Sequence, residues 1–332
     1  MKSPITGKEM ILHREERILT FRKEELPVVY HYYLCEDTGE QFTTTELDEI
    51  DLRQLYNQYR AIHHLPFPEE IKAVRKKYVL SATKMSEILG FGVNSYRKYE
   101  QGEVPNHSNG KLIRLANDPE KFKGLVELSE SLDEEKRSKL LKKIDSLIEE
   151  NEHNHFKIEM ENYLLQNKLP DEFSGYRKPD LDRLTEMVVY FTEKLQPWKT
   201  QLNKFLFYAD FLLFKNTCQS MSGTRYRAVQ MGPVPSNYSS IYEYLGNNDV
   251  LDIYVTYFDN GGIGEQFKPR PDRSFNSSLF SEEELNILDQ VVNRFKGKKT
   301  DEVIDLSHRE LAWMRNQEDK ELINYKYAFY LL

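Results

Sequence analysis

Side chains able to read the edges of base pairs are gathered in one short stretch, GFGVNSYRKYEQG, from Gly90 to Gly102. Asn94, Arg97 and Lys98 stand at positions i, i+3 and i+4, so on a helix they share one face. An asparagine amide can pair bidentately with adenine, and lysine or arginine can contact guanine or a phosphate. This spacing predicts a contact with DNA.

A helix-turn-helix is the element that would hold these side chains in place. An amphipathic helix begins at Glu69, and Ser81 is a favourable N-cap for a second helix that stops at Gly90. A glycine turn then leads to a third helix over 93–101, which Gly102 terminates. Two short helices joined by such a turn form a helix-turn-helix, and the second of them lies in the major groove.

The other side chains of this segment divide between the protein core and the DNA. We expect Tyr99 to pack into the core and Tyr96 to lie nearer the DNA backbone. The alternative interpretation is an ordinary solvated helical surface. The predicted DNA-binding residues are Lys84, Asn94, Ser95, Tyr96, Arg97 and Lys98.

The charge distribution supports a local contact with phosphates. The chain has 332 residues and a formal net charge of −8. Residues 65–128 hold eleven Lys and Arg against eight Asp and Glu, a net charge of +3, which leaves −11 for the rest. A basic module within an acidic chain fits a local phosphate contact.

Several classes of protein are disfavoured by the sequence. The most apolar stretch, FLFYADFLLF, is too short to span a bilayer and contains Asp210. No segment resembles a signal peptide, and Cys35 and Cys218 lie far apart, so we expect a cytoplasmic protein without disulfides and without a membrane partner. The motifs HExxH and GxSxG, a Gly-rich phosphate loop and paired cysteines are all missing, so we expect no enzyme and no cofactor.

Hydrophobic periodicity predicts a mainly α chain with small β elements, an α+β fold. Residues 1–64 form a β-rich module followed by a helix, and residues 65–128 form the helix-turn-helix domain. Residues 129–177 are predicted to be a helical linker. Residues 178–332 form a second α+β unit with a hairpin around Gly261.

The stretch VRKKYVLSATKMSEILGFGVNSYRKYEQGEVPNHSNGKLIRL closely resembles the helix-turn-helix domain of MqsA-type antitoxins. The resemblance implies a domain that dimerises, binds a palindromic operator in double-stranded DNA and represses a toxin–antitoxin operon. The family's base-contacting Asn falls on Asn94 and its base-contacting Arg on Lys98, although lysine cannot reproduce the bidentate fork. The Gln common at the start of the second helix is Ala82 here.

MqsA-type proteins begin with a zinc-binding domain that has two CxxC pairs. In this chain the four positions are Ser3, Thr6, Cys35 and Thr38, so only one thiol is left. A structural zinc site takes four nitrogen or sulfur ligands, and hydroxyls are poor substitutes. We therefore expect residues 1–64 to be a degenerate zinc-ribbon-like module that holds no metal.

The stretch from Leu202 to Leu245 resembles the Panacea domain, also called SocA-like, and the resemblance extends over most of 178–332. It implies a domain that neutralises a protein toxin by direct binding. The candidate toxin contacts are Tyr208, Asp210, Phe211, Tyr226, Pro233, Pro235 and Tyr238. A purely structural role is the favoured alternative for Asp210 and the Gly-Pro-Val-Pro turn. The aromatic stripe over 205–214 is predicted to leave some rings exposed for a partner.

Two resemblances on one chain predict the antitoxin of a type II toxin–antitoxin system. Its C-terminal domain would bind the cognate protein toxin, and its helix-turn-helix would repress its own operon as a homodimer. Two alternatives stay open. One is a stand-alone transcriptional regulator with a C-terminal sensor domain, and the other is a proteolytic adaptor for a toxin.

Overall fold

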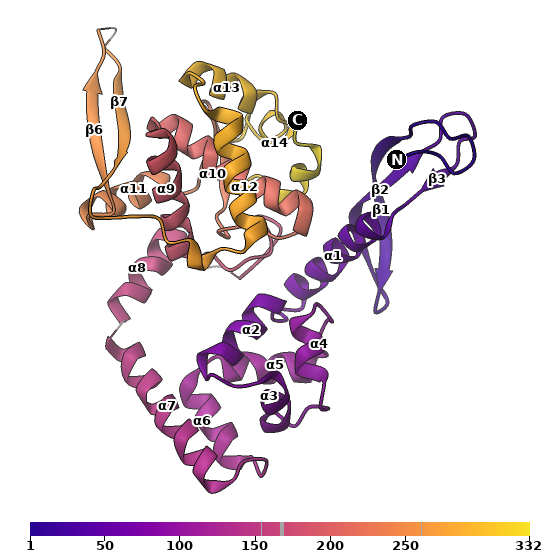
Figure 1. Ribbon diagram of the computed structural model, residues 1–332, viewed down its shortest axis with the longest axis vertical. Coiled ribbons are helices and arrows are strands. Elements are labelled where there is room, and N and C mark those ends of the chain that lie inside the picture. The colour runs from indigo at the N-terminus through magenta and orange to yellow at the C-terminus, as the bar shows by residue number, and fades with distance from the viewer. Residues whose placement is uncertain (154, 167–168, 260) are drawn as a thin grey trace. The chain divides into compact units, whose positions relative to one another are not determined.

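The computed structural model describes residues 1–153, 155–166, 169–259 and 261–332, and they form two compact units (Figure 1). The first unit combines Met1–Leu55 with Glu161–Leu332, and the second is Tyr56–Met160. Helices predominate and the sheets are small and antiparallel, which confirms the predicted fold class. No helix in the described part of the chain is long and apolar enough to cross a membrane.

The second unit consists of short helices. Helix α1 (Thr45–Ile62) begins in the first unit and ends in this one, and α8 (His155–Leu165) leads back to the first unit. Between them lie α2 (Pro68–Lys77), α3 (Ala82–Ile88), α4 (Ser95–Glu100), α5 (His107–Ala116), α6 (Pro119–Leu128) and α7 (Glu134–His153).

The predicted caps and turns of the helix-turn-helix are present. The Ser81 side chain caps α3 by accepting a hydrogen bond from the backbone N–H of Lys84 at 3.1 Å. Gly90 begins the turn after α3 with a φ of +70°, and Gly102 follows α4 with a φ of +109°, both in the region that favours glycine. Helix α4 begins at Ser95, two residues later than predicted.

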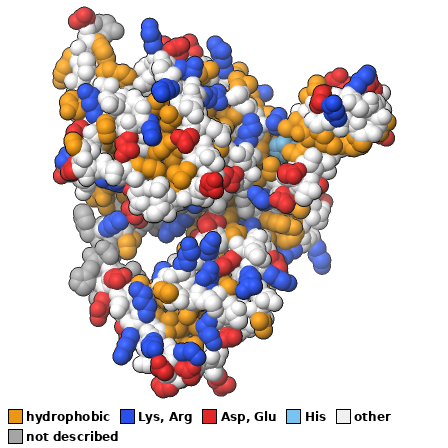
Figure 2. Space-filling view, in the orientation of Figure 1, with side chains coloured by type: hydrophobic (Ala, Val, Ile, Leu, Met, Phe, Trp, Pro, Cys, Tyr) orange, Lys and Arg blue, Asp and Glu red, His pale blue; other side chains and the backbone are white. Residues whose placement is uncertain are grey.

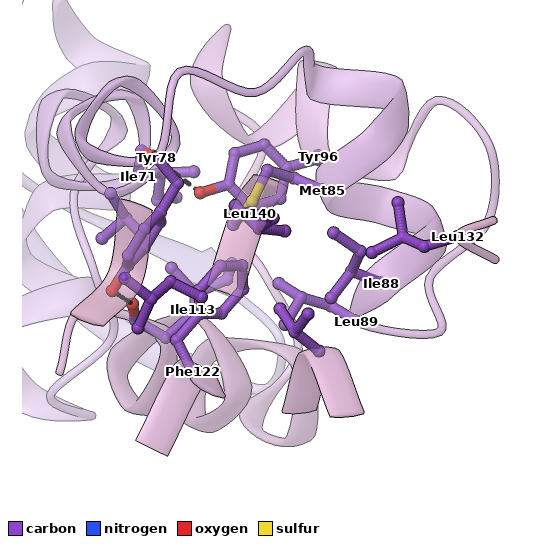
Figure 3. Close-up of a cluster of buried hydrophobic side chains, with 14 of the residues drawn as sticks. Ile71, Tyr78, Met85, Ile88, Leu89, Tyr96, Ile113, Phe122, Leu132 and Leu140 are labelled. Atoms are coloured by element: carbon purple, nitrogen blue, oxygen red, sulfur yellow. Dashed lines mark hydrogen bonds between the residues drawn. The ribbon is translucent and has the colours of Figure 1, made fainter. Parts of the chain in front are cut away.

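An apolar cluster packs the helices of the second unit together, and Figure 3 labels ten of its members. Ile71 of α2, Met85 of α3 and Ile113 of α5 are fully or almost fully buried in it. Residues that the sequence assigned to the linker also take part, since Leu140 and Ile144 of α7 are buried in the same cluster. Helix α7 therefore packs on the helix-turn-helix in addition to leading away from it.

The first unit begins with an antiparallel sheet of order β1–β2–β3, formed by β1 (Ile11–Phe21), β2 (Glu24–Leu34) and β3 (Gln41–Phe42). Two long strands, β1 and β2, are present in the segment where the sequence predicted β structure. On β2, buried His31 contacts Asp51 of α1 at 2.7 Å between Nδ1 and Oδ1, and its ring meets Phe329 edge-on. The β-rich segment therefore packs on the far C-terminal end of the chain.

The rest of the first unit surrounds the apolar helix α10 (Lys199–Thr217), almost all of whose residues are buried or half-buried. Around it lie α9 (Leu181–Leu195), α11 (Tyr238–Asn247), α12 (Glu282–Phe295), α13 (Thr300–His308) and α14 (Leu311–Met314), with the 3₁₀ turns η1 (Ser277–Leu279) and η2 (Tyr325–Tyr330). Two hairpins complete the unit: β4 (Tyr226–Val229) with β5 (Gly232–Pro235), and β6 (Leu251–Tyr257) with β7 (Ile263–Pro269). The predicted hairpin is thus present, although residue 260 of its turn lies outside the described residues.

Candidate functional sites

Three of the side chains predicted to read DNA lie on the open face of α4 and its N-cap. Asn94, Arg97 and Lys98 are all exposed, and among the described residues their side chains make no hydrogen bond or ion pair. They are therefore available to a partner outside the second unit.

Tyr96 does not lie near the surface, contrary to the prediction. Its side chain is fully buried, and its hydroxyl donates a hydrogen bond to the backbone carbonyl of Ile71 at 2.7 Å (Figure 3). Burial raises the pKa of the Tyr96 hydroxyl, which stays neutral. The reason is helical geometry: Tyr96 is two residues from Asn94 and so faces the opposite side of the helix. Tyr99 is buried, as predicted, and Asn109 donates to its hydroxyl.

Two further residues of the predicted DNA-binding set are partly buried. Lys84 is half-buried, forms an ion pair with Glu87 and donates to the Ser131 carbonyl at 3.3 Å. Ser95 is half-buried at the start of α4. Only the exposed triad of Asn94, Arg97 and Lys98 is open to solvent without an intramolecular partner among the residues described.

A bidentate ion pair fixes α4 against α2. Arg75 donates to the two carboxylate oxygens of Glu100 at 2.6 and 3.1 Å. Its third guanidinium nitrogen donates to the backbone carbonyl of Leu80 at 2.9 Å. The hydrogen bond to Glu100 raises the pKa of Arg75, so the guanidinium stays charged. Sequence reasoning missed this pair because its members are 25 residues apart and neither belongs to a motif.

The four positions of the degenerate ribbon converge around one sulfur atom. Cys35 and Ser3 are buried, and Thr6 Oγ1 lies 3.7 Å from Cys35 Sγ. Hydrogen bonds from Ser3, and then from Thr38 and Thr6, lower the pKa of the Cys35 thiol to about 7. The donor set is one thiol and three hydroxyls, which does not fit a tetrahedral zinc site.

Asp210 of α10 is a buried carboxylate that organises the loop before β4. Its Oδ1 accepts the backbone N–H groups of Met221 and Ser222, each at 2.7 Å. Its Oδ2 accepts the Ser222 hydroxyl at 2.6 Å and the Tyr226 hydroxyl at 2.7 Å. Burial raises the pKa of Asp210, and these four donors oppose that rise because they stabilise the ionised form. Asp210 therefore has the structural role that was the favoured alternative.

The other candidate toxin contacts are also core residues, with one exception. Tyr208, Phe211 and Tyr226 are fully buried, and Pro233 and Pro235 are buried in β5. Tyr238 alone is half-buried and reaches the surface. The expected exposed rings of the aromatic stripe are likewise absent, because every ring from Phe205 to Phe214 is buried. Helices and hairpins surround α10 on all sides. An aromatic stripe that is wider than one helix face is therefore still buried in the core.

Comparison with known proteins places these features in families. Residues 1–125 match the family described as the MqsA antitoxin component of bacterial toxin–antitoxin systems. Antitoxin MqsA of Escherichia coli (strain K12) is 33% identical over 121 residues, which is 35% of this chain and 91% of that relative. The chain belongs to the MqsA antitoxin family.

This MqsA-family chain carries a second antitoxin match. Residues 202–314 match the family described as antitoxin SocA-like, Panacea domain. That segment runs from α10 to α14 and contains the Asp210 network. The MqsA match covers the degenerate ribbon and the helix-turn-helix, so the two matches do not overlap.

The Asp210 network gives a stability prediction. Replacing Asp210 with Ala leaves four buried donors unpaired, so we expect the free energy of unfolding to fall by about 3 kcal/mol or more. Tyr226→Phe removes one donor to a charged group and should cost about 1.5–3 kcal/mol. Urea denaturation measures both, with Tyr238→Phe as the matched control within about 0.5 kcal/mol of wild type. An unchanged stability of Asp210→Ala would contradict the structural role.

The ribbon gives a prediction about zinc. The native chain should purify with far less than one zinc per chain, because hydroxyls stand at three of the four ligand positions. The triple variant Ser3→Cys, Thr6→Cys, Thr38→Cys should bind one zinc, because the four positions already converge. Metal analysis by atomic emission measures both. Stoichiometric zinc in the native chain would overturn the assignment, and a zinc-free triple variant would contradict the convergence of the four positions.

Proposed function

We propose that this chain is the antitoxin of a type II system, which binds its protein toxin through the first unit and represses its operon through the second. The observation that carries the proposal is that two antitoxin families match separate segments of one chain. The structure supports a division of labour, because the α4 triad and the Panacea segment lie in different compact units.

DNA binding is supported by the chemistry of α4. Tyr96, Tyr99 and the Arg75–Glu100 pair hold one side of the helix against the core, and Asn94, Arg97 and Lys98 are presented on the other. This is the arrangement of a recognition helix, whose first residues contact base edges. We further propose that the operator is palindromic and that two copies of the chain bind it, because helix-turn-helix proteins commonly read two half-sites as symmetric dimers.

Toxin binding needs a surface other than the buried motif residues. The β6–β7 hairpin lies within the Panacea match and exposes Val255, Tyr257 and Ile263. Tyr257 and Ile263 are paired across the two strands and Val255 lies on the same face. Figure 2 shows hydrophobic side chains along this hairpin. Aromatic and aliphatic side chains of this kind form the centres of protein interfaces. We propose this hairpin face as the toxin-contacting surface.

The DNA contact has a distinctive salt signature. Lys98→Ala should weaken operator binding and lower the slope of log K against log salt by about 0.9 per chain, since one phosphate or base contact loses its charge. Asn94→Ala should weaken binding by about 1–3 kcal/mol with the slope unchanged, because an amide releases no counterion. Gel-shift titrations on the chain's own upstream region, over a range of salt, measure both.

The matched control is Lys139→Ala, an exposed lysine on α7 of the same unit. It removes the same charge and should leave both affinity and slope unchanged. If Lys139→Ala and Lys98→Ala behave alike, α4 is not the recognition helix and only net charge matters. Loss of toxin neutralisation together with loss of DNA binding in Asn94→Ala would argue against the division of labour.

The hairpin face has a matched test within the same fold. Ile263 is 65% exposed and Ile18, on the N-terminal hairpin, is 61% exposed. Ile263→Asp should weaken toxin binding by about 1–3 kcal/mol because it places a charge in an apolar interface, whereas Ile18→Asp should not. Copurification and titration with the product of the neighbouring reading frame measure the effect. Equal effects of the two substitutions would refute the hairpin as the contact surface.

A further inference from the structure

A cavity of about 320 Å³ in the first unit has no part in the proposed antitoxin function. It lies between the start of α10, the β4–β5 turn and the beginning of α11. Its volume is at the lower end of the range for small-molecule sites. The cavity is open to solvent on one side, and all of its lining residues belong to one compact unit.

The charges that line this cavity are of one sign. Lys199, Lys204 and Lys320 all contribute, and the described lining residues include no Asp or Glu. Lys199 pairs with Glu265 at 2.9 Å, outside the lining, whereas the side chain of Lys320 is exposed at the rim. Neutral hydrogen-bonding groups are present as well, among them Thr200 and Asn203 of α10 and the Tyr238 hydroxyl.

Lys204 is the unusual member of this set. Its side chain is 0% exposed, and among the described residues its Nζ has no hydrogen-bond partner. An ammonium group buried without a partner is costly, so folded proteins rarely retain one without a purpose. Burial lowers the pKa of Lys204 to about 7.

The backbone around Lys204 is built to accommodate its side chain. Gly232 at the start of β5 has a φ of +96°, and a Cβ there would lie 2.7 Å from Lys204 Cε and 2.5 Å from Ser307 Oγ. A residue with a side chain would therefore displace the lysine. The His308 Nε2 atom is a second buried nitrogen without a partner among the described residues, and the charge of Lys204 helps to lower the pKa of His308, after burial as the larger cause. Lys204 Nζ thus offers a donor that has no acceptor among the described residues.

We infer that this cavity binds a small anionic molecule that carries a phosphate or carboxylate group, with Lys204 as the buried counter-charge. The anion supplies the acceptor that Lys204 lacks, and Lys320 at the rim adds a second positive charge. Asn203 and Tyr238 line the same space and can orient the rest of the ligand. The recognition helix belongs to the other compact unit, whereas the Lys199–Glu265 ion pair links this site to the β6–β7 hairpin.

The test uses the full-length protein and two anionic probes. Sodium phosphate and sodium succinate are titrated by calorimetry and by thermal melting, with neutral succinamide at matched ionic strength as the control. At least one anion should bind and raise the melting temperature in a saturable way, and succinamide should not. The comparison of the two anions shows whether phosphate or carboxylate is the recognised group.

Substitutions then locate the site. Lys204→Met fills a similar volume without charge, so it should fold and should raise the dissociation constant for the bound anion by at least about tenfold, because a charge-assisted contact is lost. Lys296→Met makes the same change at an exposed position of this unit and should alter the dissociation constant by less than about twofold. Lys320→Met, at the exposed rim, gives an intermediate loss and carries the test should Lys204→Met fail to fold. Equal binding of anions and succinamide by the wild type, or undiminished anion binding by the cavity variants, would overturn the inference.

Discussion

The function of the second unit depends on how firmly one side of a six-residue helix is anchored. A helix this short has little stability of its own, because nucleation is costly and few backbone hydrogen bonds are gained. In this protein, tertiary contacts supply the stability that the short helix α4 lacks on its own. The Tyr96 hydroxyl bonds to the Ile71 carbonyl, and Arg75 holds Glu100 through two hydrogen bonds. Because these contacts fix the rotation of α4 about its axis, they determine which side chains face outward.

A second buried contact has the same role in the first unit. Asp210 binds four donors from the segment between Met221 and Tyr226, so one carboxylate fixes the path of the chain from α10 into β4. The Panacea motif residues are thus parts of the framework. We propose that recognition falls to exposed side chains such as those of the β6–β7 hairpin and to the cavity at Lys204.

The sequence predicted helix ends correctly, because capping and turn conformation depend on a few adjacent residues. Ser81, Gly90 and Gly102 mark the ends of helices through capping and positive φ, which are properties of a few adjacent residues. The spacing of Asn94, Arg97 and Lys98 was sufficient to place them on one exposed face. The same reasoning should have placed Tyr96 on the buried face, since it lies two residues beyond Asn94.

Contacts between residues that are far apart in the sequence could not be predicted from local patterns. Nothing local pairs Arg75 with Glu100 or brings His31 to Phe329. The aromatic rings of α10 were expected to be partly exposed because an amphipathic helix buries one stripe, yet this helix is covered all round. Lys204 lies in the stretch that resembles the Panacea domain, but its burial without a partner among the described residues emerges only from the packing of α10, β5 and α13.

The central claim is that α4 reads DNA with an outward face while its inward face stays in the core. The most direct measurement is nuclear magnetic resonance of the ¹³C,¹⁵N-labelled protein during titration with its upstream DNA. We predict that the side-chain amide signals of Asn94 shift or broaden on binding, whereas the ring signals of Tyr96 stay close to their free positions. An Asn94 amide that is unaffected at saturation would contradict the account.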